Sequence, residues 1–259
     1  MQKHLLTFSF ILFSLAGYSQ WTKFYLSNDL KLLNKQNDTI AAPFTGGMLN
    51  PQVGMMDLNN DQIKDLVIFD KNGAKITTYL NRGTAGQSDF IHAPRFEAAF
   101  PKLFSWMYLA DYNCDGKEDI FTSVLGGVKV YKNTSSNGNL SFELISDYMV
   151  DVDNIGLYCF FDDYPAFEDI DKDGDLDFLA FDVFGTNVWL YRNERVELGL
   201  PCDTLVFKWV DGCWGAFAEA ESSRNLALGQ ACPWYKFYKN EEGPKTPRFC
   251  VKKQIFFYI

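Results

Sequence analysis

Three nine-residue stretches of the chain carry side-chain oxygens at positions 1, 3, 5 and 9, a spacing that could hold a metal ion. Each stretch also needs a tight turn, for which glycine is suited because it tolerates positive φ. Position 6 is Gly116 and Gly174 in two stretches and Gln62 in the other. The oxygen-bearing residues are, in order, Asp57, Asn59, Asp61 and Asp65; Asp111, Asn113, Asp115 and Asp119; and Asp169, Asp171, Asp173 and Asp177.

This arrangement predicts calcium binding. Ca²⁺ takes about six to eight oxygen ligands, and oxygens at positions 1, 3 and 5 can converge from one side of a tight coil. We expect a backbone carbonyl at position 7 and the aspartate at position 9 to complete the shell. Without a cation, carboxylates this close together would repel one another. The alternative is three solvated acidic turns, but the recurrence of the pattern favours metal binding. The position-7 residues are Ile63, Lys117 and Asp175.

The sequence around the stretches predicts β-strands and not the helices of an EF-hand. An EF-hand needs a glutamate at position 12 and flanking helices, whereas position 12 here is Ile68, Thr122 or Ala180. A short apolar run follows each stretch, at residues 66–69, 120–125 and 178–181. Such runs are typical of buried strands. The metal would therefore lie in a connection between two strands.

The stretches belong to a longer repeat, because they begin at residues 57, 111 and 169 and are thus 54 and 58 residues apart. Each unit has the same order of parts: an apolar strand, the acidic stretch, a buried strand, a turn, a strand ending in Tyr-x-Asn, and an outer strand. Four short antiparallel strands per unit are the make-up of a β-propeller blade. The Tyr-x-Asn endings are Tyr79–Asn81, Tyr131–Asn133 and Tyr191–Asn193.

These residues resemble the FG-GAP/VCBS repeats of integrin-α-like β-propellers, over roughly residues 45–210, with an acidic loop followed in phase by a strand ending in Tyr-x-Asn. The whole chain is similar to exported VCBS-repeat proteins of Bacteroidetes. The resemblance implies Ca²⁺ at the loops, a propeller fold and an extracellular binding role, and it does not imply catalysis. Gln62 departs from the family pattern, and a non-glycine residue with positive φ would cost about 1 kcal/mol or more. We expect the first site to be the weakest.

The sequence divides into four parts. Residues 1–19 read as a secretory signal peptide with a short basic start, an apolar stretch and small residues before the cleavage point. Residues 20–50 form an N-terminal lead-in, residues 51–209 form three blades, and residues 210–259 form a cysteine-containing extension. The predicted fold is all-β, a propeller-like array of about three four-stranded blades in an incomplete ring. Closed propellers need at least about four blades, so either residues 20–50 and 210–259 supply a degenerate fourth blade or the chain is a truncated piece of a larger ring. We favour the second, with an extension that is truncated or frameshifted.

Composition and charge exclude several functions. A net charge of −9 argues against nucleic acid as a partner. The chain has two histidines, and His4 lies in the predicted leader, so a histidine-dependent catalytic triad would have to use His92, which we interpret as structural. The apolar part of the leader is too short to span a bilayer comfortably, and no membrane span is expected elsewhere.

The cysteines are compatible with disulfides in an exported chain. Cys202 could pair with Cys213, or Cys213 with Cys232. Either disulfide would cross-link the extension. Cys114 occupies a position inside the second stretch that is not a metal ligand, and we interpret it as a local packing residue. Zinc binding is disfavoured because the chain has no Cys-x-x-Cys pair and almost no histidine.

Three functions compete on this evidence. The first is a non-catalytic, calcium-stabilised module, secreted or at the cell surface, that binds an extracellular protein or glycan on its loops. The second is a carbohydrate-active enzyme, a lyase or glycosidase, that would use carboxylate pairs such as Asp162 and Asp163 or Asp151 and Asp153. The third is a calcium buffer, for which the aromatic-rich scaffold would be unnecessary. We favour the first.

Overall fold

The computed structural model describes residues 32–39, 45–83, 89–219 and 225–229. The chain divides into two units, Met1–Ile40 and Ala41–Ile259. In the first unit, the described residues form a turn closed by an antiparallel bridge between Leu33 and Thr39. The predicted signal peptide lies outside the described residues, as do residues 236–259, on which the expectation of truncation depends.

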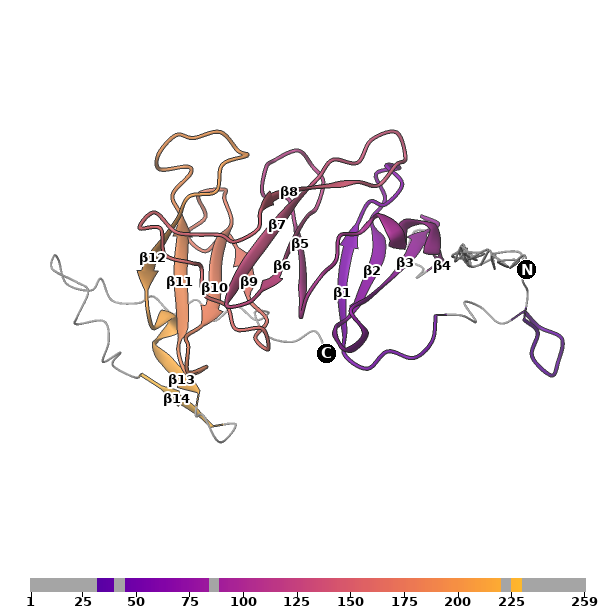
Figure 1. Ribbon diagram of the computed structural model, residues 1–259, viewed down its shortest axis with the longest axis horizontal. Coiled ribbons are helices and arrows are strands. Elements are labelled where there is room, and N and C mark those ends of the chain that lie inside the picture. Colours follow the sequence, from indigo (N-terminus) through magenta and orange to yellow (C-terminus); the bar gives the residue numbers. More distant parts are fainter. Residues whose placement is uncertain (1–31, 40–44, 84–88, 220–224, 230–259) are drawn as a thin grey trace, which may run out of the picture. The chain divides into compact units, whose positions relative to one another are not determined.

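The second unit contains three four-stranded antiparallel sheets, each built from strands in sequence order (Figure 1). The all-β prediction and the division into blades of four strands are therefore confirmed. Each acidic stretch connects the first and second strands of its sheet, as expected. The strands are β1 (Pro51–Met56), β2 (Asp65–Asp70), β3 (Lys75–Asn81) and β4 (Phe90–His92); β5 (Met107–Ala110), β6 (Asp119–Val124), β7 (Gly127–Asn133) and β8 (Phe142–Ser146); and β9 (Ala166–Glu168), β10 (Asp177–Phe181), β11 (Val188–Asn193) and β12 (Phe207–Asp211).

The second strand of the middle sheet, β6, is apolar on both faces because it lies between the first and third sheets. In β6, Ile120 belongs to a core cluster with Val67 and Phe69 of the first sheet. The next residue, Phe121, points to the opposite face and packs in a second cluster with Phe178 of the third sheet. Burying both faces explains why this strand reads as a continuous apolar run in the sequence.

The segment after β12 packs on the other face of the third sheet. Leu179, Val188 and Leu190 form a third cluster there, and Trp214 and Phe217 pack against it. Trp214 begins a short 3-10 helix, and Phe217 begins the first strand of a two-stranded sheet. Part of the cysteine-containing extension therefore covers the third blade. The remaining elements are the 3-10 helices Lys71–Gly73, Pro94–Ala99 and Trp214–Ala216, and the strands β13 (Phe217–Glu219) and β14 (Leu226–Leu228).

Two of the cysteine predictions were wrong, namely the Cys202–Cys213 pairing and the packing role of Cys114, whereas the alternative Cys213–Cys232 pairing stays a prediction. Cys114 is bonded to Cys202, with the two Cα atoms 5.8 Å apart, so Cys202 does not pair with Cys213 and Cys114 is not a mere packing residue. Cys213 is also disulfide-bonded, and the predicted alternative partner, Cys232, lies outside the described residues. The Cys114–Cys202 bond closes a loop of 88 residues, which in the chain-entropy model stabilises the fold by about 4–5 kcal/mol.

A repeated contact between sheets explains this pairing. Cys114 is position 4 of the second acidic loop, and Cys202 lies in the connection between β11 and β12 of the next sheet. In the first loop, position 4 is Asn60, whose Oδ1 accepts a hydrogen bond of 3.1 Å from the N–H of Gly138. Gly138 lies in the corresponding connection, between β7 and β8, of the second sheet. Position 4 of a loop thus meets the outer connection of the following sheet.

Candidate metal centres

The aspartate at position 1 organises each loop. Its Oδ1 accepts the backbone N–H of position 5, at 3.1, 3.2 and 3.1 Å in the three loops. Its Oδ2 accepts the N–H of position 6, at 2.7, 2.8 and 3.1 Å. One carboxylate therefore holds the loop backbone wrapped around itself, as short polar side chains do in turns. The position-1 residues are Asp57, Asp111 and Asp169.

Position 5 continues the same arrangement. The Oδ1 atoms of Asp61, Asp115 and Asp173 accept the N–H of position 7 at 2.8, 3.0 and 3.0 Å. At position 3, Asn59 and Asn113 each accept the N–H of position 5 at 3.0 Å. The bonds accepted at positions 1 and 5 recur in all three loops and the bond accepted at position 3 recurs in the first two, so the loop backbones are held in a similar way.

Two residues per loop have left-handed backbone conformations. Position 6 has positive φ in all three loops, with values of 70° at Gln62, 80° at Gly116 and 99° at Gly174. The expected strain at Gln62 is therefore confirmed. Position 4 also has positive φ, at 63°, 62° and 67°, which the sequence did not indicate. Its residues are Asn60, Cys114 and Lys172.

Replacing Gln62 by glycine is expected to stabilise the protein by about 0.5–1 kcal/mol, because glycine removes the Cβ penalty at positive φ. The reverse change, Gly116→Gln, should destabilise by a similar amount, since a Cβ at Gly116 meets no atom within 4 Å and adds only backbone strain. Urea unfolding of both variants measures the effect. Equal stability of Gln62→Gly and the parent protein would contradict the strain assigned to position 6.

The aspartate at position 9 is buried and acts as a clamp. Its Oδ2 accepts the N–H of position 2, at 2.9, 3.2 and 3.0 Å. Its Oδ1 accepts the N–H of the asparagine that ends the third strand, at 2.7, 2.7 and 2.9 Å. The clamp joins the loop to that strand, which gives the Tyr-x-Asn signature a structural meaning. The aspartates are Asp65, Asp119 and Asp177, and the asparagines are Asn81, Asn133 and Asn193.

Burial raises the pKa of the clamp aspartates. It raises the pKa of Asp119 and of Asp177 to about 6, although the two backbone hydrogen bonds on each carboxylate act in the opposite direction. The pKa of Asp65 is raised for the same reason. In each loop, the negative charges of neighbouring carboxylates raise the pKa of the clamp aspartate further. A cation near these groups would reverse the effect, because it favours their charged form.

Position 7 contacts the residue two places beyond the same asparagine. A Cβ added at Gly83 would lie 2.8 Å from the Cδ1 of Ile63, and Lys117 Nζ donates to the carbonyl of Ser135 at 2.9 Å. In the third loop the pair is ionic, with Arg195 Nε 3.5 Å from Asp175 Oδ2. Burial nevertheless raises the pKa of Asp175 to about 6.

The third loop provides the test of whether a cation fits. Carboxylate oxygens of Asp169, Asp171 and Asp173 all lie within 4.8 Å of one another. The Oδ2 of Asp173 is buried and has no hydrogen-bond partner among the described residues. A buried carboxylate oxygen of this kind is costly unless something compensates its charge, and the donors are all oxygens, as a hard cation requires. The residues at this loop therefore fit a metal ion.

A second acidic group adjoins the first. Oxygens of Asp173, Asp175 and Glu197 also lie within 4.8 Å of one another, and the Oδ1 of Asp175 is buried without a hydrogen-bond partner in the described part of the chain. A guanidinium lies beside each group, because Arg195 Nε is 3.5 Å from Asp175 Oδ2 and Arg192 Nε is 2.9 Å from Asp171 Oδ2. We assign the predicted ion to the first group because it contains the side chains at positions 1, 3 and 5 of the loop.

The carboxylates of the enzyme alternative have structural contacts. Asp162 forms an ion pair of 2.8 Å with Lys71, and Asp151 Oδ1 accepts the N–H groups of Asp153 and Ile155, both at 2.9 Å, within a turn. Burial raises the pKa of Asp163 to about 6. None of these contacts by itself positions two carboxylates across a substrate.

One period of the repeat matches a known protein family. Residues 57–122 match the family model described as an FG-GAP-like repeat, a span that runs from the first acidic loop through the second and into β6. None of the curated proteins matches the chain. Among solved structures, the chain is similar to an Agrocybe aegerita lectin that specifically recognises non-reducing terminal N-acetylglucosamine. The TM-score is 0.36 at 17% identity, and the match covers 68% of this chain and 46% of the lectin chain. The sugar recognition is a property of that lectin.

Proposed function

Because this chain is an FG-GAP repeat protein, with the matched repeat at residues 57–122, we propose that it is a non-catalytic binding module stabilised by three Ca²⁺ ions. The observation that carries the proposal is the set of backbone hydrogen bonds that the aspartates at positions 1 and 5 accept in all three loops, together with the close approach of the carboxylate oxygens at positions 1, 3 and 5 of the third loop. The ligands would be those predicted from the sequence, and the position-7 carbonyl would complete the shell.

Calcium suits the site better than the other common metals. The ligand side chains are carboxylates and amides, and neither histidine nor thiolate is among them, which disfavours zinc and copper. Mg²⁺ demands near-ideal octahedral geometry, whereas Ca²⁺ accepts the flexible, oxygen-rich surroundings of a loop. The ions would act structurally, by neutralising carboxylates that otherwise repel one another at the connections between strands.

An extracellular location and a protein or glycan ligand complete the proposal. Two observations support export: the signal-like pattern of residues 1–19, and the Cys114–Cys202 disulfide, because disulfides persist in oxidising compartments. The part of the chain that the structure describes contains no helix with the length and apolar character needed to cross a membrane. The ligand would bind on the loops that connect the strands, where binding residues are commonly found on rigid scaffolds.

Calorimetric titration of Ca²⁺ into metal-free protein tests the proposal. We expect three sites with Kd values of about 10⁻⁴–10⁻³ M, the range of extracellular calcium modules. Asp173→Ala should reduce the count to two, because it removes the side-chain oxygens at position 5 of the third loop. Asp162→Ala, a matched change at an exposed carboxylate outside the loops, should leave three sites. Absence of saturable binding in the parent protein would refute the calcium assignment.

A further inference from the structure

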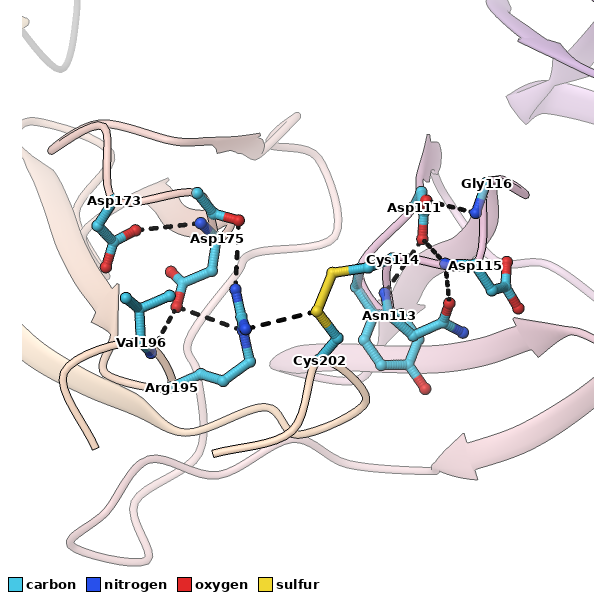
Figure 2. Close-up of a disulfide and its surroundings, with 12 residues drawn as sticks. Asp111, Asn113, Cys114, Asp115, Gly116, Asp173, Asp175, Arg195, Val196 and Cys202 are labelled. Carbon is cyan, nitrogen blue, oxygen red and sulfur yellow. Dashed lines mark hydrogen bonds and ion pairs between the residues drawn. A yellow bond between two sulfur atoms is a disulfide. The ribbon is translucent and has the colours of Figure 1, made fainter. Parts of the chain in front are cut away.

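The Cys114–Cys202 disulfide lies between two of the acidic loops: Cys114 belongs to the second loop, and Cys202 is linked to the third loop through Arg195 (Figure 2). Cys114 stands between Asn113 and Asp115, two predicted ligands of the second loop. Cys202 belongs to the connection between β11 and β12, which also carries Arg195. The bond therefore fixes the backbone of the second loop at position 4, where φ is 62°.

The same connection holds the third loop through Arg195. Its Nη2 donates to the carbonyl of Gly174 at 3.2 Å, and its Nε lies 3.5 Å from Asp175 Oδ2. The neighbouring N–H of Val196 donates to the same Asp175 oxygen at 3.2 Å. On its other side, Arg195 Nη1 lies 3.6 Å from the sulfur of Cys202. Residues 195–202 thus join the disulfide to position 7 of the third loop.

Both attachments hold the backbone or a side chain next to predicted ligands, at Cys114 in the second loop and at Asp175 in the third. A loop held in its binding conformation before the ion arrives loses less conformational freedom on binding, and so binds more tightly. The first loop provides an internal comparison, because within the described residues its position 4 is held by the Asn60–Gly138 hydrogen bond and not by a covalent bond. Cys114 is solvent-exposed, so a reductant can reach the bond.

We propose that the Cys114–Cys202 disulfide controls the cation affinity of the second and third loops. This inference rests on the proposed function, since it concerns ions at the same loops. In the reduction step, a dithiol reductant supplies two electrons and two protons, the S–S bond breaks to give two cysteine thiols, and the dithiol closes to its own disulfide. Release of Cys114 frees position 4 of the second loop, and release of Cys202 loosens the segment that carries Arg195.

The test compares the parent protein with Cys114→Ser/Cys202→Ser, which removes this disulfide and leaves the one at Cys213 intact. Calcium titration should show two of the three sites weakened by about tenfold, within the range of typical coupling between sites, with the site of the first loop unchanged. Cys159→Ala, which removes the buried free thiol, is the control and should bind Ca²⁺ as the parent does.

A reciprocal measurement on the parent protein does not depend on the variant folding. If the disulfide tightens cation binding at two sites, cations bound at both sites must favour the disulfide by the product of the two factors. The oxidised fraction of Cys114 in a glutathione buffer, measured by alkylation and mass spectrometry, should therefore be higher with Ca²⁺ than without it. If the Ca²⁺ affinities of the double variant equal those of the parent, and Ca²⁺ leaves the oxidised fraction of Cys114 unchanged, the link between disulfide and cation binding is refuted. The proposed calcium sites are not refuted by that result. If the oxidised parent binds no Ca²⁺ at all, the proposed function itself fails.

Discussion

Removing Ca²⁺ is expected to lower the melting temperature at pH 7 by roughly 10–25 °C. With Kd values of about 10⁻⁴–10⁻³ M, 10 mM Ca²⁺ stabilises the folded state by about 1.4–2.7 kcal/mol per site. Three sites together give roughly 4–8 kcal/mol, and each kcal/mol shifts the melting temperature of a chain of this size by about 2–4 °C. Circular dichroism with and without Ca²⁺, at constant ionic strength, measures the shift.

The size of this shift should depend on pH. In the metal-free protein, the clamp carboxyls of Asp119 and Asp177 keep their protons up to pH values near 6, because their pKa is raised to about 6. In the unfolded chain, the same groups ionise near the ordinary value of 3.8. The folded state therefore binds more protons between these values, and these groups make the metal-free protein less stable as the pH rises from about 4 to 6.

Bound Ca²⁺ favours the ionised carboxylates, so it offsets that loss over the same range. The difference in melting temperature between calcium-loaded and metal-free protein should thus be small at pH 5 and largest at pH 7 and above. Mg²⁺ at the same concentration is the control for a general charge effect. Identical melting curves with and without Ca²⁺ at pH 7 would contradict the stabilising role of the ions.

Replacing the clamp aspartate of the second loop, Asp119→Ala, is expected to destabilise the protein by roughly 3–5 kcal/mol even without Ca²⁺. Asp119 is fully buried, and its carboxylate accepts the N–H groups of Tyr112 and Asn133 at 3.2 and 2.7 Å. The substitution leaves both donors buried without an acceptor, at about 1–3 kcal/mol each, and it also leaves a small cavity.

Asp115→Ala is the matched control, because Asp115 is an exposed predicted ligand of the same loop. It should cost about 1 kcal/mol or less in metal-free protein, as surface substitutions usually do with the loss of one exposed hydrogen bond, while it abolishes the calcium response of that loop. Urea unfolding of both variants, with and without Ca²⁺, separates the clamp from the ligand role. Equal stability of the two metal-free variants would contradict the clamp.

The elements of the fold followed from local pattern, whereas the contacts between sheets did not. The apolar run after each acidic loop predicted a buried strand because burial on both faces leaves no polar position, as Ile120 and Phe121 illustrate. Positive φ at Gln62 could be predicted because glycine fills the same position in the other two loops. Position 4 has three unrelated residue types, so its positive φ could not be predicted from the residues that occupy it.

The disulfide and the Arg195–Asp175 pair were missed for a similar reason. Cys114 and Cys202 are 88 residues apart, and only the packing of one sheet on the next brings them together. The Tyr-x-Asn signature was recognised, but its connection to position 9 was not. The signal was present in the sequence, because Asn81 and Asn193 each follow their clamp aspartate by the same 16 residues and Asn133 follows its own by 14.

The contact between position 4 and the outer connection of the following sheet gives the array a polarity. The acidic loop of one blade contacts the outer connection of the next blade. This contact is a hydrogen bond at Asn60 of the first blade and a covalent bond at Cys114 of the second. At the third blade the same forward-facing position is the exposed Lys172. A fourth blade grafted after β12 should therefore carry an acidic residue where the third carries Cys202. The negative charge on its outer connection would then pair with the positive charge of Lys172.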